Sequence, residues 1–274
     1  MENLDDEIRL EDSFAYRNYG KDIGNIYKPE CLAMEVVSPE AFMDGDMADK
    51  AKESINYGPG DRFDMTGMAA DTFRKMCKES MDVAALKYLG DKPETYNLIF
   101  DSSVFNITKK EKLAYIDSVR TLNSDNDPQS ALEVEQVLKY LVVHNFVNNY
   151  DSYTGVFDHN YYLREYNGQL SMIPWDYNLA FGSFTLKMID KLISTNTDYS
   201  IDFSSLNCMS EETSYINYPI DTPCIGVDMN ERPLVNVLLS DERYLEIYHQ
   251  YFDEFMTSFL ENGVFDSLYT RTWN

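Results

Sequence analysis

Three polar residues in the middle of the chain have side chains suited to binding a divalent cation. Asp151 follows a stretch with the apolar spacing of a helix, Asn160 lies nine positions later, and Asp176 follows a second apolar run. Between the last two, Asn167-Gly168 separates two apolar runs, the strongest short-range signal for a β-hairpin because both turn positions require φ > 0. A hairpin brings its ends together, so the three side chains can converge at one mouth. Mg²⁺ takes such oxygen ligands and keeps waters and substrate phosphates in its remaining positions.

The order of these residues matches the logic of a protein kinase. In kinases a catalytic-loop Asp accepts the proton of the substrate hydroxyl, a downstream Asn binds one metal ion, and an Asp after a hairpin binds another. The spacing differs, because nine positions separate Asp151 from Asn160 where the ordinary kinase motif has about five. The motifs HRD and DFG are both absent.

Three segments around these residues resemble the CotH kinase family, a group of atypical, secretory-type protein kinases named for a spore coat protein. They are NYDSY at residues 149–153, HNYYL at residues 159–163, and IPWDYNLAFG at residues 173–182. The last segment is the most specific of the three. Further similar stretches, such as GNIYKP at residues 24–29, extend the resemblance over nearly the whole chain.

The resemblance implies an α+β, mainly helical fold. We expect residues 1–274 to form one domain, the large lobe of a protein kinase, with a small β-hairpin at its active edge. Residues 1–7 resemble the hinge that follows the N-terminal small lobe in this family, so the small lobe is expected to lie upstream, and truncation at the C-terminus stays open. Lys28 falls after that hinge, where a structural role is favoured over phosphate binding.

The resemblance also implies an activity, which is transfer of the γ-phosphoryl group of ATP to Ser or Thr of a coat or cell-surface protein. Asp151 would be the catalytic base, and Asn160 and Asp176 would hold the Mg²⁺ or Mn²⁺ that accompanies ATP. Asn178 could add a carbonyl ligand or merely cap a turn. By the same resemblance the protein would act in the spore coat, at the cell surface or after secretion.

Ordinary structural roles remain open for the same residues. Asp151 and Asp176 could each be turn residues that bond their own backbone, and Asn160 could satisfy loop backbone at a strand end. Asp176 follows an apolar strand and a Pro-Trp pair, where burial of an unpaired carboxylate would be costly and metal binding would remove that cost.

Two other functions compete with phosphoryl transfer. One is a non-catalytic coat or envelope assembly protein that keeps the kinase-like fold, and sequence upstream of residue 1 would discriminate between the two. The other is a carbohydrate-processing enzyme, in which Asp151 and Asp176 would face each other across a sugar that stacks on Trp175 and nearby tyrosines.

Composition excludes several classes of protein. A formal charge of −24 argues against a nucleic-acid partner, because binding phosphate backbones needs clustered Lys and Arg. No apolar run is long enough for a transmembrane helix. Widely scattered histidines and the absence of a Gly-x-Ser-x-Gly segment argue against zinc and Ser-His-Asp chemistry. The four cysteines have no Cys-x-x-Cys spacing and are expected to be buried or free thiols: Cys31, Cys77, Cys208 and Cys224.

A long helix must deliver Asp151. Ser130 with Glu133 has the spacing of a capping box that would open this helix. Its apolar residues form a broad face, typical of a central helix buried on most sides, and such a helix would hold the base rigidly. The residues of this face are Leu132, Val134, Val137, Leu138, Leu141, Val142 and Phe146.

Other helices are expected to surround it. Apolar spacing predicts a helix from Asp71 to Leu89, and Thr108 with Glu111 forms a capping box for a helix that runs to Leu122. Pro233 suits the first position of a further helix. Ser240 would then cap a longer helix that ends at Gly263, with an aromatic stripe of Tyr244, Tyr248, Tyr251, Phe255 and Phe259.

Several remaining residues are assigned to the framework. His144 and His249 are expected to be ordinary packed or surface histidines, and His159 to hold its loop by hydrogen bonds. By analogy with a kinase large lobe, Arg232 would be a buried ion-pair partner. The weakly patterned stretch from residue 196 to 230 corresponds to the activation segment of a kinase and is expected to be a loop.

Overall fold

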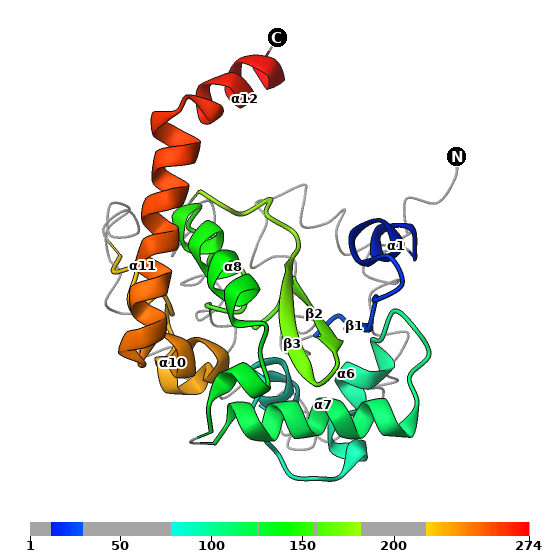
Figure 1. Cartoon of the computed structure of the whole chain (residues 1–274). Coiled ribbons are helices and arrows are strands. Elements are labelled where there is room, and N and C mark those ends of the chain that lie inside the picture. The colour runs from blue at the N-terminus through cyan, green and yellow to red at the C-terminus, as the bar shows by residue number, and fades with distance from the viewer. Residues whose placement is uncertain (1–11, 30–77, 125, 156–157, 182–217, 274) are drawn as a thin grey trace, which may run out of the picture.

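The computed structural model describes residues 12–29, 78–124, 126–155, 158–181 and 218–273. In these ranges the protein is mainly helical, with one three-stranded antiparallel sheet near its centre (Figure 1), which agrees with the α+β prediction. The expected hinge, most of the expected activation segment and three of the four cysteines lie outside the described residues. Cys224 is a buried free thiol, as expected.

The hairpin forms where the sequence predicts it. Strand β2 (Tyr161–Tyr166) pairs antiparallel with β3 (Gln169–Pro174). Asn167 and Gly168 connect them with φ of 54° and 82°, the positive values that this two-residue turn requires. Strand β1 (Asn25–Tyr27) pairs with the other edge of β2, so the sheet order is β1-β2-β3.

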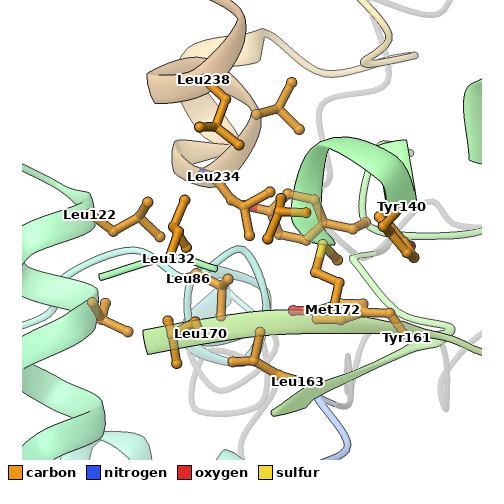
Figure 2. Close-up of a cluster of buried hydrophobic side chains, with 14 of the residues drawn as sticks. Leu86, Leu122, Leu132, Tyr140, Tyr161, Leu163, Leu170, Met172, Leu234 and Leu238 are labelled. Atoms are coloured by element: carbon orange, nitrogen blue, oxygen red, sulfur yellow. The ribbon is translucent and has the colours of Figure 1, made fainter. Parts of the chain in front are cut away.

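Both faces of the hairpin are buried. This explains why its strands contain runs of apolar residues instead of alternating apolar and polar residues. On one face Tyr161, Leu163, Leu170 and Met172 enter the main core beneath the helices (Figure 2). On the other face a smaller cluster forms, whose buried members are Ala15, Ile26, Tyr162 and Ile173. A sheet packed on both faces has little freedom to slip in register.

Helix α8 (Val134–Phe146) is the predicted central helix, and it contacts both β3 and α11. The predicted capping box at its start is wrong. Ser130 ends a separate short 3-10 helix (Pro128–Ser130) and donates to the carbonyl of Asp127, while Glu133 at the N-cap makes no side-chain cap bond.

The start of α8 is fixed by β3 instead of by a cap. The Glu133 amide donates to the Leu170 carbonyl at 3.0 Å, and the Leu170 amide donates to Ala131 at 2.7 Å. One turn later the Gln136 side chain accepts from the Met172 amide at 3.0 Å and donates to the Met172 carbonyl. These bonds satisfy the outer edge of β3, which would otherwise be open to another strand.

Helix α7 (Lys109–Leu122) begins with the predicted capping box. The Glu111 amide donates to Thr108 Oγ1 at 3.4 Å, and the Thr108 amide donates to Glu111 Oε2 at 2.6 Å. The helix expected from Asp71 is described from residue 78 and ends at residue 84, earlier than the predicted Leu89. Among the described residues before α8, the chain also forms α1 (Asp12–Tyr19), the 3-10 helix η3 (Pro93–Tyr96) and α6 (Asn97–Asp101).

The C-terminal helices follow the prediction with one correction. Helix α10 (Pro233–Leu239) begins at Pro233, as expected. Helix α11 (Glu242–Met256) is capped by Asp241, which accepts from the Arg243 amide, and not by Ser240. It continues through a π-helical turn (Thr257–Glu261) to Gly263, which has φ of 73° and separates it from α12 (Val264–Trp273). None of the helices in the described ranges is long and apolar enough to cross a membrane.

Candidate functional site

The loop that carries Asp151 is folded tightly against the end of α8. Asn148 has φ of 48°, so the chain reverses there and turns Asp151 back toward the sheet. At Gly155 a Cβ atom would lie 1.9 Å from the carbonyl oxygen of Tyr150, which leaves room only for glycine. The loop therefore closes on itself within a few residues, and Asp151 is only 6% exposed.

Asn160 meets Asp151 directly. Its Nδ2 donates to the Asp151 carbonyl at 3.0 Å and to Asp151 Oδ2 at 2.9 Å. Because the amide nitrogen is used in this way, the amide oxygen of Asn160 remains as an acceptor for a ligand. The structure thus brings together two residues that the sequence predicted to converge.

His159 lies beside the other oxygen of the same carboxylate. Its Nε2 lies 3.0 Å from Asp151 Oδ1, and its side chain is largely buried. The carboxylate is therefore approached from two sides by groups of the adjoining turn. Among the described residues, Asp151 Oδ1 itself has no hydrogen-bond partner, so this contact does not test the expectation that His159 holds the loop by hydrogen bonds.

A buried ion pair anchors the loop between Asp151 and Asn160. Arg232, just before α10, pairs with Asp158, and both side chains are almost fully buried. The same guanidinium donates to the Tyr153 carbonyl at 2.7 Å and to the Gly155 carbonyl. Burial raises the pKa of Asp158, and the Arg232 charge opposes that rise. The expectation that Arg232 is a buried ion-pair partner is confirmed.

Asp176 lies at the same end of the hairpin as Asn160. Tyr161, the first residue of β2, pairs with Pro174, the last residue of β3. Asn160 therefore lies beside the segment that leaves β3, and Asp176 follows Pro174 by two positions. Asp176 has φ of 49°, and both Asp176 and Asn178 are exposed. The argument that metal binding offsets burial of Asp176 is therefore wrong, because its carboxylate already faces solvent.

A complete metal site is not formed by acidic, His and Cys side chains alone in the described part of the chain. The oxygens of Asn160 and Asp176 at one end of the hairpin could supply part of a ligand set. This suits Mg²⁺ or Mn²⁺, which accept one or two protein oxygens and take the rest from water and phosphate.

Several residues around this site have a left-handed backbone conformation. Asn148, Asp158, Asn160, Asp176 and Phe181 all have positive φ, between 48° and 59°. Such conformations are uncommon for residues other than glycine and persist only where the surroundings impose them. Asn and Asp adopt positive φ more readily than other residues, so Phe181 is the unusual member of this group.

His144 is a packed histidine, as expected, and it lies beside the candidate site. It is 1% exposed, its Nε2 contacts Ser152 Oγ, and its Nδ1 lies 3.1 Å from Tyr177 Oη. Its ring stacks on Tyr140 at 5.1 Å, and burial lowers its pKa to about 3. The available signal was a polar residue on the apolar face of the helix that leads to Asp151.

The aromatic residues near the site are mainly structural. Trp175 packs edge-on against Tyr162 at 5.1 Å, and it belongs to the smaller core cluster. Tyr161 and Tyr162 are buried. Tyr161 and Tyr162 therefore offer no open face on which a sugar could stack, while Trp175 is partly exposed.

Comparison with known proteins identifies a family. A family model described as CotH kinase protein matches residues 6–274, essentially the whole chain. No curated protein and no solved structure matches the chain.

Proposed function

The chain belongs to the CotH kinase family, and from this premise we propose that it is a metal-dependent phosphotransferase. The reaction is transfer of the γ-phosphoryl group of ATP to a Ser or Thr hydroxyl of a coat or cell-surface protein. The fold around the site is, in this proposal, the large lobe of an atypical kinase.

The contact between Asn160 and Asp151 is the observation that carries the proposal. Two hydrogen bonds from one amide nitrogen fix the catalytic-loop acid and leave the amide oxygen of Asn160 for a metal ion. The exposed carboxylate of Asp176 stands at the same end of the hairpin. An acid, an amide and a second acid after a hairpin are the parts that kinases use in this order.

Each residue has a defined task in this reaction. Asp151, held by Asn160 and with His159 beside its other oxygen, orients the substrate hydroxyl and accepts its proton as the oxygen attacks the γ-phosphorus. Asn160 and Asp176 would hold Mg²⁺ or Mn²⁺, with Asn178 as a candidate additional ligand. The metal supplies charge neutralisation for the phosphates. Most of the contribution of the protein is then positioning.

Thermal stability with ligands tests the proposal. We expect Mn²⁺ and ATP together to raise Tm by about 5–10 °C at a hundredfold excess over Kd, because ligand binding stabilises only the folded state. Neither ligand alone should do so, and Asp176→Ala should abolish the shift. Asp253→Ala, an exposed carboxylate on α11, is the matched control and should keep it.

A second measurement separates catalysis from binding. Transfer of the γ-phosphoryl group of ATP to Ser/Thr-containing protein should accompany the stabilisation and should require the metal. A folded protein that shows no stabilisation at millimolar ligand would contradict the proposal and favour the alternative, an assembly protein that keeps the kinase-like fold.

A further inference from the structure

His144 contacts the neighbours of both acids in the candidate site. Its Nε2 faces Ser152, the residue after Asp151, and its Nδ1 faces Tyr177, the residue after Asp176. The two acids reach the site from different elements, one from the loop after α8 and the other from the segment after β3. The side chain of His144 contacts both the loop after α8 and the segment after β3.

We propose that His144 is a positioning residue that fixes the distance between the Asp151 loop and the Asp176 segment through hydrogen bonds to Ser152 and Tyr177. The proposal rests on the phosphotransfer function stated above, because the role of His144 would be to keep the base, Asp151, at a fixed distance from a metal ligand, Asp176. His144 itself contacts neither acid, so its action would be indirect.

The hydrogen-bond network assigns one tautomer to the ring. Ser152 Oγ lies 2.9 Å from the Asn149 carbonyl, which can only accept, and 3.4 Å from Thr154 Oγ1. When its single proton goes to the carbonyl, Ser152 accepts from His144, and Nε2 carries the ring proton. Nδ1 is then the acceptor, and the Tyr177 hydroxyl donates to it at 3.1 Å. Both nitrogens of a neutral imidazole are satisfied in this arrangement, and neither bond can form in the other tautomer without reversing the network.

The surroundings hold the ring itself in place. Tyr140, one turn earlier on α8, stacks on it at 5.1 Å, and the Tyr177 ring meets it edge-on at 5.7 Å. Helix α8 is packed against β3, the strand that leads to Asp176. The imidazole is therefore part of a rigid base under the site. A displacement of the Asp151 loop would therefore shift the Asp176 segment through His144, and the reverse also holds.

The first test reads the ring directly. With only three histidines in the chain, nitrogen NMR of the imidazoles can be assigned by single His→Gln variants. We expect His144 to show the Nε2–H tautomer in the wild-type protein. Two bonded ring nitrogens hold a single tautomer, so a ring that averages between the two tautomers would overturn the proposal, and this measurement needs neither metal nor ATP.

The second test removes one bond at a time while keeping the ring. Tyr177→Phe and Ser152→Ala should each weaken Mn²⁺–ATP affinity about tenfold, a loss typical of groups that orient metal ligands. If both act through His144, the double variant should be little worse than either single one. Tyr166→Phe is the control, because it loses a tyrosine hydroxyl bond, to Asp22, at the opposite end of the hairpin. Its affinity should stay within twofold of the wild-type value.

Amide hydrogen exchange makes the outcome independent of the activity. Tyr177→Phe should speed exchange in the Asp151 loop as well as in its own segment, and Tyr166→Phe should change neither. Unchanged exchange in the Asp151 loop would overturn the positioning role even in an active enzyme. Absence of Mn²⁺–ATP binding by the wild-type protein would instead contradict the proposed function and leave exchange to decide the inference.

Discussion

The unusual spacing between Asp151 and Asn160 has a structural explanation at the level of single residues. The loop between them is longer than in ordinary kinases, yet Asn160 returns to within 2.9 Å of the Asp151 carboxylate. Arg232 holds the additional loop residues in place, since it binds the carbonyls of Tyr153 and Gly155 and pairs with Asp158. A different loop length thus presents the same acid and amide pair.

Substitution of the proposed base should separate chemistry from binding. Asp151→Asn keeps the shape of the side chain and can still accept from Asn160, but it cannot take a proton. We expect kcat for phosphoryl transfer to fall about 10²–10⁴-fold, with Mn²⁺–ATP affinity within a few fold of the wild-type value. Steady-state kinetics and a metal titration measure the two quantities.

Asp117→Asn serves as the control for that experiment. Asp117 is exposed on α7 and bonds Arg120 at the surface. Its kcat should match that of the wild-type protein. A variant of Asp151 with unchanged kcat would exclude this residue as the base.

At the level of elements, two helices with similar sequence signals begin in different ways. Thr108 forms the capping box that its sequence predicts. Ser130 has the same spacing to a glutamate, but β3 bonds the backbone before α8 and leaves no place for a cap. The capping pattern is a local preference, and pairing with a strand overrides it.

This difference predicts unequal stability losses. Thr108→Ala should lower the free energy of unfolding by about 1 kcal/mol, the usual value for a lost N-cap. Ser130→Ala loses only an exposed bond to Asp127 and should cost no more than about 0.5 kcal/mol. Urea unfolding of the two variants gives both values. Equal losses would mean that Ser130 does cap α8 in solution.

At the scale of the whole molecule, the site depends on residues that are far apart in the sequence. The core packs the hairpin against residues of α7, α8 and α10 (Figure 2). Arg232, at the start of α10, reaches the loop that follows Asp151 through the interior. The C-terminal helices therefore help to set the geometry of the site. Loss of the Arg232 side chain should lower the stability of the fold.

Arg232→Met should be strongly destabilising. It leaves the Asp158 carboxylate buried without its cation, and removing one partner of a buried ion pair costs about 3–5 kcal/mol. Chemical denaturation would measure this loss. Arg120→Met is the matched control, because Arg120 makes ion pairs with Asp91 and Asp117 at the surface, and it should cost about 1 kcal/mol or less. Similar losses for the two variants would contradict a structural role for the buried pair.

The sequence by itself determined the features that depend on neighbouring residues. Asn167-Gly168 requires a hairpin turn because both residues must adopt positive φ. Thr108 and Glu111 cap α7, and Pro233 begins α10, because each choice satisfies backbone groups within a single turn. The order of acid, amide, hairpin and acid was also readable, since it follows from these local elements.

Only the tertiary structure decided the features that depend on burial and on distant partners. It placed Asp176 in solvent, started α8 against β3, and put His144 between Ser152 and Tyr177. It also joined Arg232 to Asp158 across the interior. A sequence pattern records how a residue relates to its neighbours along the chain. Desolvation and pairing depend on which segments the packed core brings together, and that is settled only when the whole chain folds.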